Sequence, residues 1–183
     1  MKIGVRAHDY GKHSIEGLAS LLREEGYDGA QLALPKVFEE IDSYEDIRLS
    51  HIERIRRAFE KNRVEIPVMG CYMDLGNPDR SVREYAVETL KTCLLYAKEM
   101  GAGVVGTETA YPRLSREERA AWCPYMMDSL MRVMEEAQRI DMKLAIEPVY
   151  WHPLADLENT LKTIRMVDDP AHLRLIFDAS NLL

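Results

Sequence analysis

The sequence has little cysteine and no long apolar run. Its 183 residues include three cysteines, Cys71, Cys93 and Cys123, and none of them forms a CxxC pair. An odd, widely spaced set argues against a disulfide framework or a structural zinc site and is typical of a reducing compartment. The N-terminal MKIGVRAHDYG lacks the apolar stretch of a signal peptide, and no apolar run reaches the roughly 18 residues that span a membrane. We therefore expect a cytoplasmic protein without a membrane partner.

A basic stretch is also missing. The chain carries 24 Lys and Arg against 31 Asp and Glu, which gives a net charge of −7. An excess of acidic residues does not favour binding to the negatively charged phosphate backbone, so we expect no nucleic-acid partner. With 46% hydrophobic and 30% charged residues, the composition is that of one globular domain with a sizeable core.

Several catalytic motifs are absent. The sequence contains no GxGxxG after a strand pattern, no GxxxxGK[ST], no GxSxG and no HExxH. No motif therefore supports a dinucleotide-binding protein, a P-loop protein, a serine hydrolase or a zincin.

Short apolar segments alternate with longer helical patterns along the whole chain, which predicts a parallel α/β sheet. The expected strands are residues 2–7, 30–34, 66–72, 104–107, 144–147 and 173–178. Five helical segments lie between them, and Ser14, Ser115 and Asp156 are expected N-caps for three of these. Pro124 lies inside the fourth helical pattern and predicts a kink or break near Cys123.

The last helical segment has an apolar repeat. We expect Leu157, Leu161 and Ile164 on its buried side, because this spacing places them on one face of a helix.

Polar residues end nearly every expected strand, where parallel α/β folds build their active sites. Glu147 ends the fifth strand and Asp178 the sixth, and the two-residue period places them on the same side of the sheet. Two converging carboxylates repel each other unless a cation or a shared proton joins them, and hard oxygen ligands suit Mg²⁺ or Mn²⁺. The alternative is that strand-end carboxylates cap the next helix or face water.

Three more residues are candidates for the substrate side of a site. His8 ends the first strand, and Glu108 ends the fourth, where it is either a substrate contact or a residue on the approach to a helix. His152 follows Glu147 in a loop with Tyr150 and Trp151. Aromatic side chains beside carboxylates often pack against a sugar ring, but Trp151 is equally well explained as a cover over the core.

The strand ends read, in chain order, GVRAHDYG, GAQLAL, GCYMDLGNPD, GTETAYP, IEPVYWH and IFDASNLL. Together they resemble the sugar phosphate isomerase/epimerase branch of the xylose isomerase-like TIM barrels. The resemblance runs along essentially the whole chain and is most specific at the Glu-Pro of strand five followed by the Asp of strand six. It implies a (β/α)8 TIM-barrel type of fold, here incomplete, with six parallel strands and five helices in a single partial barrel domain over residues 1–183. A full barrel takes about 250 residues.

The resemblance also implies a chemistry. Family members hold a divalent metal, Mn²⁺, Mg²⁺, Co²⁺ or Zn²⁺, with a Glu, an Asp, a His and a second Glu, and Glu147 and Asp178 match the first two. Glu147 would then be both ligand and catalytic acid/base in proton transfer α to a carbonyl. Asn181 matches a polar position three places after the Asp and joins His8, Glu108 and His152 as a substrate-side candidate. The His and the second Glu have no counterpart here.

The expected activity is thus isomerisation or epimerisation of a small sugar, sugar phosphate or polyol. One alternative is a catalytically incomplete binding or assembly module, with copies covering the open barrel edges in a homo-oligomer. Another is a metal-dependent hydrolase resembling the apurinic endonucleases of the same superfamily. At the level of the fold, the rival is an open doubly wound sheet, which requires the strand order to reverse.

Overall fold

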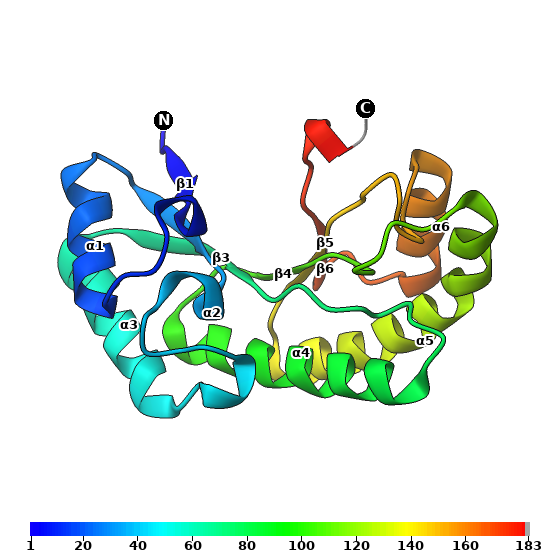
Figure 1. The fold of residues 1–183 in the computed structure, drawn as a ribbon, viewed down its shortest axis with the longest axis horizontal. Coiled ribbons are helices and arrows are strands. Elements are labelled where there is room, and N and C mark those ends of the chain that lie inside the picture. The colour runs from blue at the N-terminus through cyan, green and yellow to red at the C-terminus, as the bar shows by residue number, and fades with distance from the viewer. Residues whose placement is uncertain (182–183) are drawn as a thin grey trace. The chain divides into compact units, whose positions relative to one another are not determined.

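The computed structural model describes residues 1–181, and it divides into two compact units. Unit 1 consists of Met1–Gly70 and Leu95–Val105, and unit 2 of Cys71–Leu94 and the chain from Gly106 onward. The strands pair in the order β1 to β6, without reversal. Figure 1 shows the chain coloured along its length, from blue at the N-terminus to red at the C-terminal end. This sequential order confirms the barrel type of topology and excludes the doubly wound alternative.

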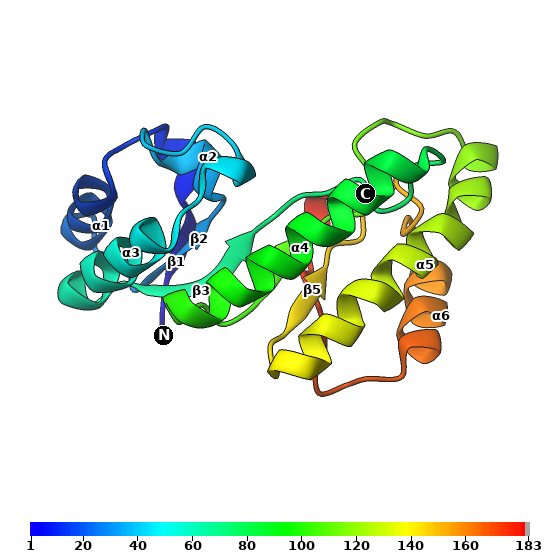
Figure 2. The same ribbon diagram turned by 90° about the horizontal axis from the view of Figure 1, so that it is seen from below.

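Unit 1 holds the first three strands, β1 (Gly4–Arg6), β2 (Gly29–Leu32) and β3 (Glu65–Gly70). β2 pairs in parallel with both β1 and β3. Helices α1 (Ile15–Glu24) and α3 (Leu49–Asn62) lie side by side, as Figure 2 shows. Their facing sides form a buried apolar core made of Ile15, Leu18, Leu22, Ile52, Ile55 and Phe59.

The ends of α1 follow the expected chemistry. The Ser14 hydroxyl accepts a hydrogen bond from the Gly17 N–H at 3.2 Å, which satisfies one of the free donors at the helix start. Gly26 follows the helix with a φ of 87°, a conformation that costs glycine little. A one-turn helix, α2 (Leu34–Val37), was not expected, so the described chain has six α-helices rather than five.

Unit 2 contains β5 (Leu144–Ile146), β6 (Leu173–Leu175), α5 (Arg116–Ile140) and α6 (Leu157–Val167). β4 (Val105–Thr107) and α4 (Arg80–Met100) contribute residues to both units. β5 and β6 pair in parallel, with Ile146 opposite Leu175. The expected strands are therefore all present, although the sixth ends three residues before Asp178.

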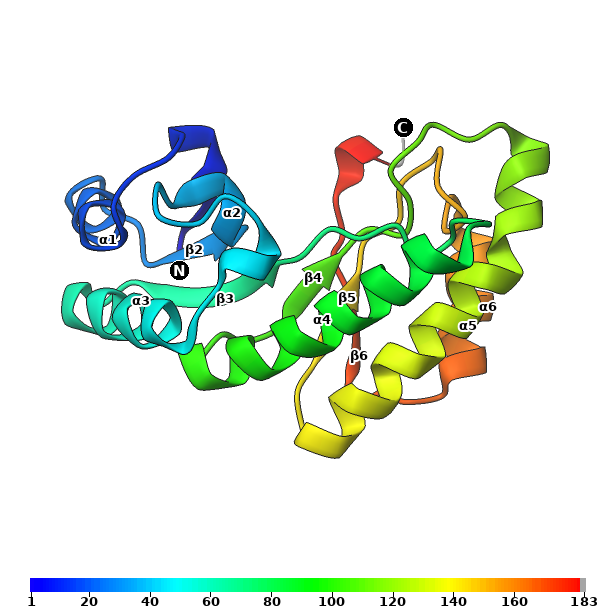
Figure 3. The ribbon, with the colours of Figure 1, turned by 60° about the horizontal axis from the view of Figure 1, so that its bottom comes forward.

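The long helix α5 starts at the predicted cap, where Ser115 and Glu118 each bond the other's backbone N–H. Pro124 lies within the helix, which continues past it to Ile140, so of the predicted kink or break the break is absent. Figure 3 shows α5 bending in its N-terminal half, as expected where a proline removes a backbone donor.

Helix α6 is capped by Asp156 as predicted, since its carboxylate accepts from the Asn159 N–H at 2.8 Å. Its buried side, however, consists of Thr160, Thr163 and Val167. Leu157 is 72% exposed, Leu161 is 39% exposed and Ile164 is half-buried, so the predicted buried face is wrong. Burying Thr160 costs little, because its hydroxyl is satisfied within the helix: it donates to the Asp156 carbonyl at 2.7 Å.

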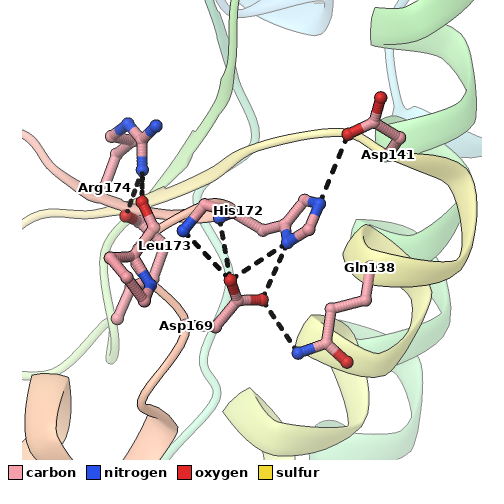
Figure 4. A network of polar contacts seen from close by, with 8 residues as sticks. Gln138, Asp141, Asp169, His172, Leu173 and Arg174 are labelled. Atoms are coloured by element: carbon pink, nitrogen blue, oxygen red, sulfur yellow. Dashed lines mark hydrogen bonds and ion pairs between the residues drawn. The ribbon is translucent and has the colours of Figure 1, made fainter.

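The turn before β6 is held by a polar network around Asp169 (Figure 4). Its carboxylate accepts from the N–H groups of Ala171 and His172, from the Gln138 amide and from the His172 ring. His172 Nε2 lies 3.3 Å from Asp141 at the end of α5. Asp169 thus ties α5 to the start of β6. Over the described residues, no helix is long and apolar enough to cross a membrane.

Candidate active site

Four strand-end loops of unit 2 are joined in series by backbone hydrogen bonds. The Gly76 N–H donates to the Thr109 carbonyl, which links the loop after β3 to the loop after β4. The Leu114 N–H donates to Trp151, and the Tyr150 N–H donates to Asn181, each at 3.1 Å. The loops after β3, β4, β5 and β6 are therefore fastened to one another.

Glu147 lies at the end of β5 and is held from two directions. Its N–H donates to the Thr107 carbonyl of β4 at 2.9 Å, and its side chain accepts from the Asn181 amide, with Nδ2 2.6 Å from Oε1. Only 7% of the residue is exposed. A buried carboxylate in a fixed orientation is the arrangement required of a proton-transfer group.

Asp178 follows β6 in the neighbouring position. The Ile176 N–H donates to the Ile146 carbonyl at 3.1 Å, so the pairing of the chain with β5 continues beyond β6. The Asp178 carboxylate accepts from the N–H and the hydroxyl of Ser180 at 2.9 and 2.7 Å. Glu147 and Asp178 thus lie at adjacent strand ends, and Asp178 also caps the turn that contains Asn181.

Glu108 and His152 are brought together by the loops after β4 and β5. His152 Nδ1 lies 3.9 Å from Glu108 Oε2, and the His152 side chain is 1% exposed. Burial lowers the pKa of His152 to about 4. His152 is therefore a neutral imidazole at pH 7, buried in the loop after β5.

Asp74 belongs to the strand-end segment GCYMDLGNPD, and the sequence does not predict it as a site residue. It follows β3 and is 3% exposed, with Oδ2 accepting from the Asn77 amide at 2.8 Å. Burial raises the pKa of Asp74. The sequence predicts that Asp74 follows a strand. Its burial depends on tertiary packing, which the sequence pattern does not specify.

The sequence also does not predict Tyr111, in the loop after β4, as a site residue. Its hydroxyl donates to the Tyr72 carbonyl at 2.8 Å. Burial first, and then the nearby acidic groups of Cys71, Asp74 and Glu108, raise the pKa of Tyr111 to about 12.

His8 belongs to unit 1, where it lies in a 3-10 turn, Ala7–Tyr10, directly after β1. Its Nδ1 has no hydrogen-bond partner within residues 1–181. Burial, and then the charges of Arg6 and Lys36, lower the pKa of His8.

The candidate ligands for a divalent cation are the carboxylates of Glu147 and Asp178. Glu147 and Asp178 supply hard carboxylate oxygens at adjacent strand ends, which suits Mg²⁺ or Mn²⁺. Among the described residues, no three His, Cys, Asp or Glu side chains gather around one point. Glu147 and Asp178 are thus two candidate ligands, and within residues 1–181 they do not by themselves form a cation site.

Comparison with known proteins identifies the class. Residues 19–183 match the family described as Xylose isomerase-like TIM barrel, and the chain belongs to this family. None of the curated proteins compared with the sequence matches it significantly.

Solved structures show the same fold. The 3-keto-D-glucoside 4-epimerase YcjR from E. coli superposes with a TM-score of 0.73 at 16% identity, covering 96% of this chain and 67% of its own. A xylose isomerase-like TIM barrel protein from Mycobacterium smegmatis, solved in complex with magnesium, gives 0.75 at 16% identity, covering 99% and 65%. D-psicose 3-epimerase, solved in the presence of D-fructose, gives 0.74 at 12% identity, covering 96% and 62%. The chain spans about two thirds of the length of these structures.

Proposed function

We propose that the protein acts as a metal-dependent isomerase or epimerase of a small sugar or related polyol, by proton transfer at the carbon next to a carbonyl. The observation that carries the proposal is the fixing of Glu147 at the end of β5. The Asn181 amide bonds this buried carboxylate, β4 bonds the Glu147 backbone N–H, and Asp178 lies at the adjacent strand end.

Each residue has a separate task in this reaction. Glu147 would accept the proton from the substrate carbon and return it, while the Asn181 amide keeps its carboxylate oriented. Asp178 and Glu147 would hold the cation. When bound, a divalent cation supplies positive charge that stabilises the negative charge developing on the substrate oxygen. The hydrogen-bonded loops would keep water away from the reacting carbon.

Two of the solved relatives support the substrate class, since they are named as epimerases of a keto-glucoside and of D-psicose. Another was crystallised with magnesium, which supports a divalent cation. At 12–16% identity these relatives share a fold with this chain, and the assignment of the reaction is ours.

Calorimetric titration with Mn²⁺ tests the proposal. We expect the wild-type protein to bind the cation, and Glu147→Gln and Asp178→Asn each to weaken that binding at least tenfold because each removes a charged ligand. Glu158→Gln, an exposed acid in the first turn of α6, is the matched control and should bind as wild type does. Equal affinity in all four proteins would contradict the assignment of the ligands.

Activity is tested separately, by following exchange of the proton next to the carbonyl of D-fructose in deuterated water by NMR. Wild type with Mn²⁺ should exchange this proton, and Glu147→Gln should not. Cation binding without exchange on any of a panel of ketoses would favour a binding module over an enzyme.

A further inference from the structure

Unit 1 contains a cavity where β3 begins. Its volume is about 420 Å³, which lies within the range of small-molecule sites. The walls come from three segments of this unit: the C-terminal half of α3, residues 63–67, which include the start of β3, and the turn after α4. The residues proposed for the cation and for the proton transfer follow strand ends, so this cavity is a different place in the fold.

The first wall is built by the spacing of residues along α3. Arg56 and Phe59 lie three residues apart on one face of the helix, and Arg63 follows one turn beyond Phe59. A second wall, the turn after α4, approaches β3 closely. A Cβ on Gly103 would lie 2.8 Å from the Pro67 carbonyl oxygen, so only glycine fits at this contact.

The buried part of the lining is apolar. It consists of four side chains: Phe59, Val64, Ile66 and Met100. The backbone offers few free acceptors, because α3 and α4 both end at the cavity and N–H groups of the following turns close their last turns. The carbonyls that accept these bonds are those of Phe59, Glu60, Ala97 and Lys98. The charge that the cavity favours is therefore determined mainly by its exposed side chains.

The exposed part of the lining carries two guanidinium groups, those of Arg56 and Arg63. Within residues 1–181, neither guanidinium forms a hydrogen bond or an ion pair. Of the two carboxylates in the lining, Glu65 is paired with Lys2. Glu60 alone then opposes two guanidinium groups, which leaves one net positive charge at the cavity.

We propose that this cavity binds a small organic monocarboxylate with an apolar or aromatic body. A guanidinium fork matches the two oxygens of a carboxylate, and its flat face also packs on an aromatic ring. The apolar lining would bury the body of the ligand, and the single net charge favours one carboxylate over a phosphate dianion. The proposal is independent of the proposed function, because none of these residues takes part in that reaction.

Benzoate is the probe for the test, since it combines one carboxylate with a compact aromatic ring. A two-dimensional ¹H–¹⁵N NMR titration of the 183-residue protein measures its affinity and its place of binding together. We expect the N–H signals of Gly101 and Gly103, which line the cavity, to shift as benzoate binds. Benzamide, the uncharged analogue, should bind about tenfold more weakly, because the charge-assisted hydrogen bonds are lost.

Two variants remove the charges one at a time. Arg56→Gln and Arg63→Gly should each weaken benzoate binding about threefold to tenfold, as expected for exposed guanidinium groups. Arg63 has a φ of 55°, a conformation that glycine adopts without strain, so weaker binding in Arg63→Gly does not reflect a weakened fold. Arg57→Gln is the matched control: Arg57 is an exposed residue of the same helix outside the lining, and this variant should bind as wild type does.

The site is overturned by equal benzoate affinity in wild type, Arg56→Gln and Arg63→Gly. Absence of benzoate binding overturns it as well, as does binding of benzamide with the affinity of benzoate. Inorganic phosphate at the same concentration should not displace benzoate, and displacement would overturn the choice of ligand class. Shifts at Gly101 and Gly103 that appear in wild type and Arg57→Gln, and disappear when both Arg56 and Arg63 are replaced, support the site.

Discussion

The Asn181 amide lies 2.6 Å from Glu147 Oε1, and the Asn181 carbonyl accepts from the Tyr150 N–H. Asn181, which the family resemblance places on the substrate side, is therefore attached twice to the segment that follows β5. In this position Asn181 orients the proposed proton-transfer group, whether or not it also contacts a substrate.

Replacing Asn181 should weaken cation binding through Glu147. We expect Asn181→Ala to lower Mn²⁺ affinity about tenfold to a hundredfold, the usual effect of removing a group that orients a metal ligand. Calorimetry measures the change. Asn159→Ala, which removes an exposed amide bonded to Asp156, is the control and should bind as wild type. Unchanged affinity in Asn181→Ala would show that the hydrogen bond does not position Glu147.

His152 should make the protein less stable in mild acid. Its pKa is about 4 in the folded chain against about 6.5 in the unfolded one, so between these values the unfolded state binds the proton more readily. The free energy of unfolding should then fall by about 2 kcal/mol between pH 7 and pH 5 on account of this residue. Urea unfolding at both pH values measures the loss.

The control for this prediction is a variant that cannot titrate. His152→Gln should lose less stability than wild type between pH 7 and pH 5, whereas Ser129→Ala, a buried change without a titrating group, should keep the wild-type difference. An identical pH dependence in wild type and His152→Gln would assign the acid sensitivity to other groups.

Asp169 should stabilise the protein only while it is ionised. The Gln138 amide, followed by the His172 hydrogen bonds, holds the pKa of Asp169 below its usual value. A lowered carboxyl pKa adds stability above the unfolded value, and that stability is lost as pH falls through the folded value. Asp169→Ala should cost about 1–3 kcal/mol at pH 7, from its unpaired donors.

The loss caused by Asp169→Ala should shrink as the pH is lowered to 3, below the usual carboxyl pKa, because the unfolded wild-type chain then takes up the proton more readily than the folded one. Urea unfolding at pH 7 and pH 3 checks this change. Asp168→Ala, at the exposed neighbouring position, should not reproduce it. A loss of the same size at both pH values would mean that charge contributes nothing to the network.

Arg63 ends α3 in the left-handed region, with a φ of 55°. A side chain is strained there and glycine is not, so Arg63→Gly should raise the free energy of unfolding by about 0.5–1 kcal/mol. Arg56→Gly, inside the same helix, should lower it by about 1 kcal/mol. Chemical denaturation of the two variants provides the comparison, and equal effects at both positions would refute the argument.

The fold was largely predictable because it depends on local patterns. Apolar strands of β-branched residues and capped helices such as those at Ser14 and Ser115 each specify their own segment. The buried face of α6 was not predictable in this way. Its apolar repeat indicates Leu157 and Leu161, yet the buried residues are Thr160, Thr163 and Val167, and only the tertiary arrangement selects between these faces.

The chain positions of the candidate site residues could be predicted, whereas their contacts could not. The ends of consecutive strands place Glu147 and Asp178 at neighbouring points, and Asn181 follows from the family pattern. The burial of Asp74 and His152 arises from loops separated by many residues in the sequence, and no pattern within either loop specifies it. Hydrogen bonds such as Asn181 to Glu147 become visible only when both strands are in place.

The serial fastening of the strand-end loops bears on any attempt to redesign the protein. Because the Thr109 carbonyl receives the Gly76 N–H and the Trp151 carbonyl receives the Leu114 N–H, each loop supplies half of a bond that its neighbour requires. A graft that replaces one loop alone would leave a backbone group of the next loop without its hydrogen-bond partner. Directed evolution or loop exchange on this scaffold should therefore treat adjacent loops as a single cassette, exchanged together or left intact.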